Sequence, residues 1–410
     1  MATGVRELGG SGRSALRTPL FRQLWLANVI SNAGSWMQIV AAGWVVYELT
    51  GSATWVGALA LAQRLPMIAL VVVGGVLADR VERRRVVLGC AIGQALCAAA
   101  LAVVVGREAG GALAVLVLVG AGGIGFGLQG PALHSLVPTL VERDVLPSAA
   151  RLNSIGINLA RVIGPAVAGL LLAGVGPAAC FAVNAATFSA VIVNAVRLPE
   201  ARPQPGAGRG GVRAGLAYAR ADPAVRRLLV GMAGFTLLAS PLQTLAPAIA
   251  GEVTSDPAAL GWMLTAFGAG ALAGAWALAR AERRWERGPV IAAASVGFAA
   301  ALSCVALAET LPLLLVATAV GGAFWLWTFA STQTALQLGV RDDMRGRVMS
   351  LYLLAIVGPM PISAAATGLV GDAVGIAPAL LGCAACLLVW GLASLQLPAS
   401  PPVREVATDP

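Results

Sequence analysis

The sequence contains few charged side chains and no lysine. Only 11% of its 410 residues are charged, whereas 58% are hydrophobic and the mean hydropathy is +0.82. A soluble domain carries about 25% charged residues, so this chain has too few to cover a water-facing surface. Disorder is also excluded, because such an apolar chain collapses or inserts into a membrane. The composition therefore predicts a polytopic membrane protein.

The groups that catalysis and metal binding need are scarce as well. The chain has a single histidine, His134, and no Asp or Glu near the middle of any long apolar segment. Its six cysteines all lie in apolar stretches, and Cys383 and Cys386 have no histidine or carboxylate nearby. An intramembrane enzyme would need a nucleophile with a base, or a reactive carboxylate. We therefore expect no enzyme, no cofactor and no metal site, and we interpret the cysteines as small residues that pack between helices.

Long apolar segments account for nearly the whole chain. A spanning helix needs about 20 apolar residues. The segments predict an all-α membrane protein with twelve transmembrane helices, at 22–47, 54–78, 86–106, 112–136, 149–174, 177–197, 224–250, 258–280, 288–308, 312–338, 346–371 and 374–397. The first 20 residues are polar and show no cleavable signal pattern, so the first span is expected to be retained.

The basic residues, all arginines, alternate from loop to loop. Of 28, 25 lie on one side of the predicted bundle; Arg64 and Arg161 lie inside spans, and Arg107 lies in an opposite loop. The positive-inside rule then predicts a multi-pass protein with both termini and the middle loop in the cytoplasm. Because the arginines are spread over seven segments, the net charge of +9 is a topological signal, and nucleic acid is not an expected partner.

Short segments recur in the same order in two halves of the chain. Thr18-Pro19 and Asp222-Pro223 both read as an N-cap followed by proline at the first helical position, and Gly164-Pro165 matches Gly358-Pro359. Two six-helix halves are typical of secondary transporters, with the binding site at their interface near the bilayer midplane. The predicted domains are an N-terminal half at 1–197, a cytoplasmic linker at 198–222, a C-terminal half at 223–398 and a cytoplasmic tail at 399–410.

The loop after the second span has a specific spacing of glycine, aspartate and arginine. Gly75 permits close approach of a neighbouring helix, and Asp79 can cap a helix N-terminus or pair with an arginine from another loop. A plain positive-inside loop would explain the arginines but not the spacing of the other two. We therefore predict gating roles for Gly75, Asp79, Arg80, Arg83 and Arg84.

This loop resembles the signature of the major facilitator superfamily, with Glu82 in place of a second glycine. Within the superfamily the chain looks most like the bacterial siderophore (enterobactin)-exporter branch. The segments that carry this likeness are Tyr47-Glu48-Leu49-Thr50-Gly51-Ser52, Arg64-Leu65-Pro66, Asn158-Leu159-Ala160-Arg161 and Gly346-Arg347-Val348-Met349-Ser350. Gly164, Pro165 and Gly169 partly match the Gly-Pro motif of antiporters, which adds them to the predicted gating residues and favours export.

The resemblance implies a secondary transporter of the bacterial cytoplasmic membrane. It would export a small organic molecule, such as a siderophore, antibiotic or drug-like compound, by alternating access. Its expected partners are that cargo, the lipid bilayer and coupling protons, and it is expected to be a monomer. An importer or a lysophospholipid transporter of the same fold is the alternative. Without a mid-span carboxylate, proton coupling would need Glu48 or Asp372 in a vestibule, or competition by the substrate.

Polar side chains inside the spans are the candidate substrate-binding residues, because such groups are costly in a bilayer and usually face a cavity or a partner. The predicted set is Asn28, Asn32, Ser35, Arg64, Asn153, Asn158, Arg161, Thr236, Ser240, Gln243, Trp325, Thr328 and Thr332. An arginine at a helix centre costs about 2.5–3.5 kcal/mol on insertion scales. We therefore expect Arg161 to face the cavity, where water, Asn158 or an anionic group of the cargo satisfies its donors. The alternative is that Arg161 pairs with helix carbonyls and locks spans together.

Overall fold

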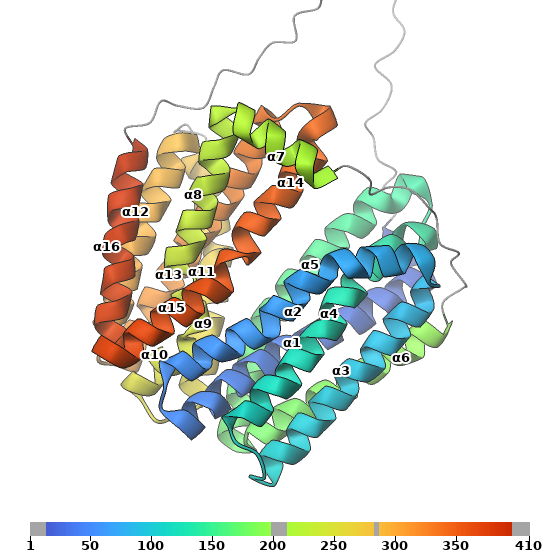
Figure 1. Cartoon of the computed structure of the whole chain (residues 1–410), viewed down its shortest axis with the longest axis horizontal. Coiled ribbons are helices and arrows are strands. Elements are labelled where there is room, and N and C mark those ends of the chain that lie inside the picture. The colour runs from blue at the N-terminus through green and yellow to red at the C-terminus, as the bar shows by residue number, and fades with distance from the viewer. Residues whose placement is uncertain (1–13, 198–210, 283–286, 396–410) are drawn as a thin grey trace, which may run out of the picture. The chain divides into compact units, whose positions relative to one another are not determined.

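The computed structural model describes residues 14–197, 211–282 and 287–395 (Figure 1). In these ranges twelve helices are long and apolar enough to cross a membrane, and no strand is present. The predicted all-α fold with twelve spans is confirmed. The end of the last predicted span, most of the linker and the C-terminal tail lie outside the described residues.

The first six spans are single long helices. They are α1 (Pro19–Thr50), α2 (Ala53–Arg80), α3 (Arg83–Gly106), α4 (Ala112–Leu140), α5 (Leu146–Gly174) and α6 (Pro177–Arg197). Short 3-10 turns precede α1 and α5, at Ala15–Arg17 and Arg143–Val145. The remaining helices are α7 (Gly211–Ala221), α8 (Pro223–Ala239), α9 (Pro241–Thr244), α10 (Ala246–Val253), α11 (Ala258–Ala281), α12 (Arg287–Ala306), α13 (Leu311–Gly339), α14 (Asp342–Val357), α15 (Pro359–Val374) and α16 (Ile376–Leu395). The helix α7 lies inside the segment predicted as a linker.

Both predicted proline starts are confirmed. The helix α1 begins at Pro19, and α8 begins at Pro223. The carboxylate of Asp222 accepts hydrogen bonds from the backbone N–H groups of Ala224 (2.9 Å) and Val225 (3.2 Å). Two N–H groups that have no partner within the helix are thereby satisfied.

The seventh and eleventh predicted spans, 224–250 and 346–371, are each made of more than one helix. The seventh span is divided at Ser240 and Leu245, each followed within two residues by a proline. The eleventh is divided at Gly358, directly before Pro359. Proline lacks the N–H that would continue the helical ladder, and its ring collides with the preceding turn. The matching Gly164-Pro165 pair, in contrast, lies inside a continuous α5.

The chain forms two compact units. Unit 1 consists of Met1–Ala42 and Ala62–Pro205, and unit 2 of Gly43–Leu61 and Gly206–Pro410. Unit 2 therefore includes the tip of the α1–α2 hairpin, which the sequence assigns to the N-terminal half. Small residues allow this: a Cβ on Gly368 would lie 2.6 Å from the Ala53 carbonyl oxygen.

Glycines also set the close helix contacts inside each unit. In unit 1 a Cβ on Gly120 would lie 3.1 Å from the carbonyl oxygen of Ala62, and one on Gly123 would collide with that of Gln63. The glycine-rich stretch in α4 is therefore a face on which α2 packs closely. In unit 2, Gly322 of α13 allows an equally close approach to the backbone of Phe267 in α11.

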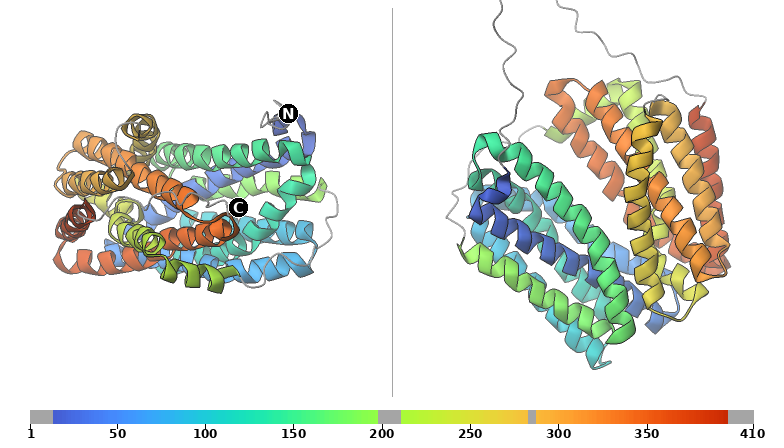
Figure 2. Two further views of the ribbon diagram at one scale, coloured as in Figure 1. Left: turned by 90° about the horizontal axis from the view of Figure 1, so that it is seen from above. Right: turned by 180° about the vertical axis from the view of Figure 1, so that it is seen from behind.

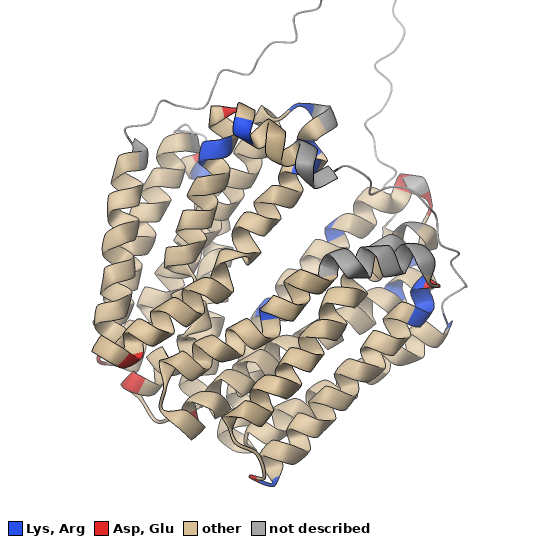
Figure 3. Cartoon of the chain, in the orientation of Figure 1, with Lys and Arg blue, Asp and Glu red and all other residues tan. Residues whose placement is uncertain are grey.

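Charge is distributed unevenly along unit 2 (Figure 3). We call the end where α8 begins and α11 ends the arginine-rich end; it carries Arg226, Arg227 and Arg280. The opposite end, where α10 ends and α16 begins, carries Glu252, Glu309 and Asp372. In unit 1 the corresponding arginine-rich end is where α1 begins and α2 ends.

Candidate functional site

The helices α1 and α5 run side by side in unit 1 (Figure 2) and contact each other between Trp25 and Met37 of α1 and between Leu152 and Gly164 of α5. The indole Nε1 of Trp25 donates to the carbonyl oxygen of Leu152 at 2.7 Å. Further along, a Cβ on Gly164 would lie 2.6 Å from both the Ala33 carbonyl oxygen and the Trp36 Cβ. Because the two helices approach so closely at these points, the side chains on their facing surfaces keep fixed positions relative to one another.

Arg161 and Arg64 are the two arginines inside the spans of unit 1. The guanidinium carbon of Arg161 lies 5.3 Å from the ring centroid of Trp36, a cation–π geometry. Arg64, on α2, is half-buried. Neither arginine forms a salt bridge with a described residue. The substrate-binding role of the two arginines stays a prediction.

The amides and the hydroxyl predicted near these arginines have different environments. The Asn158 amide donates to the Ser154 carbonyl oxygen at 2.8 Å, and the Ser35 hydroxyl donates to Ser31 at 2.9 Å. Asn28, Asn32 and Asn153 are half-buried. Asn158 therefore satisfies its own helix instead of the Arg161 guanidinium, and the substrate-binding role of all five stays a prediction.

The predicted site residues of unit 2 lie in its interior. Thr236 and Ser240 are fully buried. Their hydroxyls, and the amide nitrogen of Gln243, form no hydrogen bond with described residues. Buried polar groups are nearly always hydrogen-bonded, so three orphans beside the break in the seventh span are unusual. Their hydrogen-bonding capacity is unused within unit 2.

An aromatic cluster fills the space next to these hydroxyls. The Trp325 ring stacks on Phe329 at 4.6 Å between centroids and lies 5.7 Å from Phe235 and 5.8 Å from Phe267. Thr328 donates to the Phe324 carbonyl oxygen at 3.1 Å, and Thr332 is also buried. In this structure Trp325, Thr328 and Thr332 belong to the core of unit 2, and their contact with cargo stays a prediction.

The predicted gating residues lie on three helices. Gly75, Asp79 and Arg80 belong to the last turns of α2, but their side chains are outside the described residues, as is that of His134. Arg83 and Arg84 open α3, and Arg83 is buried. Gly164, Pro165 and Gly169 are buried on α5. Their placement leaves the gating role a prediction.

A different aspartate caps α2 at its other end. The Asp372 carboxylate accepts from the backbone N–H of Ala53 (2.7 Å), from that of Thr54 (3.1 Å) and from the Ser52 hydroxyl. A negative charge is favourable at a helix N-terminus. The contact ties α15 to the hairpin tip within unit 2. Sequence reasoning missed it because residues 52 and 372 are 320 positions apart.

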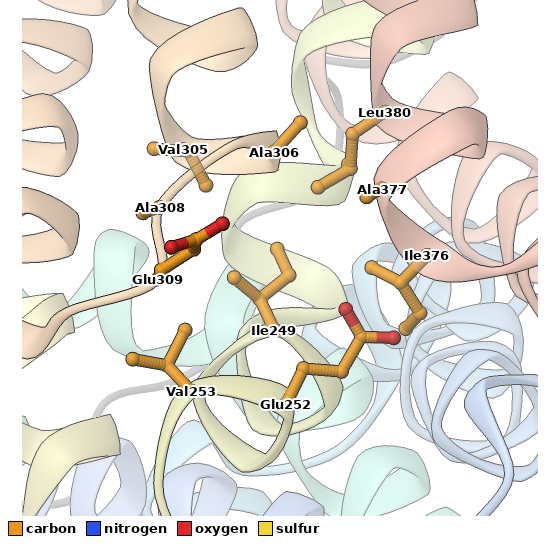
Figure 4. Close-up of a pocket in the computed structure, with 10 residues that line it drawn as sticks. All are labelled: Ile249, Glu252, Val253, Val305, Ala306, Ala308, Glu309, Ile376, Ala377 and Leu380. Atoms are coloured by element: carbon orange, nitrogen blue, oxygen red, sulfur yellow. The ribbon is translucent and has the colours of Figure 1, made fainter.

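Two glutamates line a cavity of about 240 Å³ in unit 2 (Figure 4). Glu252 approaches it from the end of α10 and Glu309 from the loop after α12, and apolar side chains such as Ile249 and Ile376 form the rest of the wall. Burial raises the pKa of the Glu252 carboxyl, and a hydrogen bond from the backbone of Ile376 partly opposes this. The sequence offered no signal for Glu252, because it lies just beyond a predicted span.

The described residues contain no group of three or more His, Cys, Asp or Glu side chains that could hold a metal ion. Twelve spans, several of them with polar side chains inside, define a polytopic membrane protein.

The comparisons with known proteins agree. A family model described as "Transmembrane secretion effector" matches residues 10–409, and the chain belongs to this family of major facilitator transporters. The multidrug efflux pump Tap of Mycolicibacterium fortuitum is 27% identical over 394 residues, which cover 93% of this chain and 96% of that protein. The enterobactin exporter EntS of Escherichia coli is 30% identical over 380 residues, which cover 90% of this chain and 86% of that protein.

Solved structures support the fold. The nucleoside transporter NupG superimposes with a TM-score of 0.73 at 13% identity, covering 92% of this chain and 98% of that one. A bacterial homologue of the human lysosomal transporter Spinster gives 0.70 at 14% identity, with coverage of 94% and 98%. At such low identity these structures establish the architecture alone.

Proposed function

We propose that the protein exports a small organic molecule, such as a siderophore, antibiotic or drug-like compound, across the bacterial cytoplasmic membrane. The carrying observation is the full-length similarity to two exporters, Tap and EntS. It is supported by polar side chains in the spans, above all Arg64 and Arg161, since ionisable groups at membrane depth usually serve transport.

The proposed mechanism is alternating access coupled to protons, carried out by a monomer. The interruptions beside Pro241 and Pro359 give the seventh and eleventh spans places to bend. Glu252, whose pKa is raised by burial, is the proposed proton carrier. It replaces Glu48 and Asp372 as the first choice, because Asp372 is engaged in capping α2.

Export is tested in bacterial cells that lack their own major efflux pumps and express the full chain. The probes are ethidium, Nile red and carboxyfluorescein, which are cationic, neutral and anionic. We expect lower accumulation of at least one probe than in cells expressing an unrelated membrane protein, with the difference lost when an uncoupler collapses the proton gradient. If each probe accumulates to the same level in these cells as in the control cells, with the chain present in the membrane, export is contradicted. Higher accumulation than in the control cells supports an importer.

The proposed orientation places the arginine-rich ends of both units in the cytoplasm. Reporter fusions at Arg209 and after Pro410 should then report the cytoplasm, and a fusion at Asp256 should report the outside. A reversed signal at any one of the three sites contradicts the proposed topology.

A further inference from the structure

The hairpin tip, residues 43–61, connects two helices of the first half to unit 2. It comprises the end of α1 and the start of α2, whereas the rest of both helices belongs to unit 1. In a transporter of this family the two halves move relative to one another during the cycle. Either the two helices bend beside the tip, or the tip leaves unit 2. Both helices are continuous where the tip begins and ends, which favours the second.

The hairpin tip contacts two helices of unit 2 at points where glycines allow a close approach. On the α1 side, a Cβ on Gly43 would lie 2.7 Å from the Cγ of Pro247 in α10. On the α2 side, a Cβ on Gly368 of α15 would lie 2.6 Å from the carbonyl oxygen of Ala53. At these points the helices meet through backbone and small side chains, so they can separate without repacking long side chains.

A single carboxylate adds a polar connection between α15 and the hairpin tip. Asp372 accepts from the backbone N–H groups of Ala53 at 2.7 Å and Thr54 at 3.1 Å. The Ser52 hydroxyl donates to the same carboxylate. Residues 43–61 contain no Lys or Arg, so the N-terminus of α2 is the positive partner that the tip offers to this charge. Because Asp372 is exposed, water can replace these hydrogen bonds when the tip moves away.

We propose that Asp372 is a conformational latch. By capping α2 it holds the hairpin tip against α10 and α15, and the tip leaves these helices once in each transport cycle. This rests on the proposed export function and specifies which contact opens the end of unit 2 opposite its arginine-rich end. The cap stabilises the closed state, but its exposure to water keeps the cost of opening modest.

A disulfide bond tests whether the hairpin tip must leave. A Cβ on Gly371 of α15 would lie 3.5 Å from that of Ala53, a distance that a disulfide can bridge. In cells that export a probe, oxidation of the Ala53→Cys/Gly371→Cys variant should form this bond and abolish efflux, and a reductant should restore efflux. The control is Gly106→Cys/Ala178→Cys, which joins α3 to α6 within unit 1 at a Cβ–Cβ distance of 3.4 Å. Its oxidation should leave efflux unchanged.

Each single-cysteine variant, oxidised in the same way, corrects for the six native cysteines. Full efflux by the cross-linked Ala53→Cys/Gly371→Cys protein would show that the hairpin tip stays in place throughout the cycle, and this would overturn the proposal. A loss of efflux that the reductant does not reverse would count against it too. If the control pair forms its bond and the test pair does not, the closed contact itself is contradicted.

Labelling of a buried cysteine tests the latch directly, in the full chain purified into nanodiscs. Ala53 is only 1% exposed, so Ala53→Cys should react with a hydrophilic maleimide only while the tip is away from α15. Adding Asp372→Ala should raise the labelling rate about 2- to 30-fold, the range that corresponds to the loss of a helix cap. Asp372→Asn should raise it less. The wild type gives the background from the native cysteines.

A second buried position separates a latch from a purely structural role. Ala112, 7% exposed at the start of α4 in unit 1, lies outside the hairpin tip, so the labelling of Ala112→Cys should not respond to Asp372→Ala. Equal increases at positions 53 and 112 would mean that Asp372 only stabilises the fold, and no increase at position 53 would mean that it holds nothing closed. Either result overturns the latch. Labelling needs no cargo, so an absence of efflux contradicts the export function and leaves this test intact.

Discussion

Polar residues recur with the same spacing, i, i+4 and i+7, in the first and seventh spans, but their environments differ. In unit 1, Asn28 and Asn32 are half-buried on a continuous α1. In unit 2, Thr236 and Ser240 are fully buried beside aromatic rings. Equal spacing of polar residues thus gives partly exposed side chains in one unit and fully buried ones in the other.

The difference arises from what surrounds each stripe. The helix α5 approaches α1 through glycines and presents an arginine, whereas α13 presents Trp325 and its phenylalanine neighbours to α8. Periodicity identifies which residues share a helix face, but the partner helix decides whether that face is wet or packed. The comparison therefore predicts functional losses from changes at the contact of α1 with α5 in unit 1 and stability losses from changes in the core of unit 2.

Removing the aromatic centre of unit 2 should give the largest effect. Trp325 is only 6% exposed and lies among four phenylalanine rings. Trp325→Ala should lower the free energy of unfolding by about 3–5 kcal/mol, because a buried indole is lost and a cavity remains. Denaturant unfolding in micelles measures this change in the free energy of unfolding. Trp276→Ala, at a side chain 67% exposed, should cost less than about 1 kcal/mol even though Arg280 packs on that ring. Similar losses in the two variants would mean that Trp325 is not part of a packed core.

Closing the gap between α1 and α5 should have the next largest effect. Gly164→Ala adds a Cβ 2.6 Å from the Ala33 carbonyl oxygen, so the helices must separate. We expect about 1–3 kcal/mol of destabilisation, as for other overpacked sites, together with weaker efflux of the exported probe because Trp36 and Arg161 move apart. Gly174→Ala is the control on the same helix, since nothing lies within 4 Å of its added Cβ. If both variants melt and export alike, the glycine contact does not position Arg161.

The cap on α2 tests whether the hairpin tip belongs with unit 2. Asp372→Ala removes the acceptor for two backbone N–H groups and one hydroxyl, so it should destabilise the protein by about 0.5–2 kcal/mol, the range for lost helix caps. Asp372→Asn should lie between the alanine variant and the wild type. Glu48→Ala, at an exposed position on α1, provides the comparison in the same melting assay. Identical melting of all four proteins would show that the cap contributes nothing.

Much of the fold follows from the sequence, because its determinants are local. Apolar length predicts the twelve spans, and Asp222-Pro223 predicts the start of α8 together with its cap. The breaks are harder to predict, because the same Gly-Pro pair interrupts the helix at Gly358 but not at Gly164. Proline removes one hydrogen bond in both places, and tertiary packing determines whether the helix continues.

The candidate site is less accessible to such reasoning. The cost of burying charge singles out Arg64 and Arg161, but the position of the Arg161 guanidinium beside Trp36 depends on how α1 and α5 pack. The pairing of Asp372 with the N-terminus of α2 and the apolar wall around Glu252 involve residues far apart in the chain. A single sequence contains no signal for such contacts, because each residue alone is an ordinary polar group near a helix end.

The smallest effect on stability should come from replacing Glu252, and this effect should depend on pH. The pKa of this carboxyl is raised above its ordinary value of 4.5 in the folded protein. Below pH 4.5 the group is protonated in both folded and unfolded chains, so its contribution to stability is fully present. As the pH rises, the unfolded chain releases the proton first, and stability falls until the pH has passed the raised folded pKa.

Glu252→Gln has no proton to release. The melting temperature of the wild type relative to Glu252→Gln should therefore decrease as the pH rises through this window. The decrease should be modest because part of the Glu252 side chain is exposed. Repeating the titration at high salt separates the causes, since screening weakens charge–charge repulsion but has little effect on desolvation by Ile249 and Ile376. A difference in melting temperature between the two proteins that is constant with pH, or that salt removes, would contradict burial as the cause of the raised pKa. It would also remove the support for Glu252 as the proton carrier.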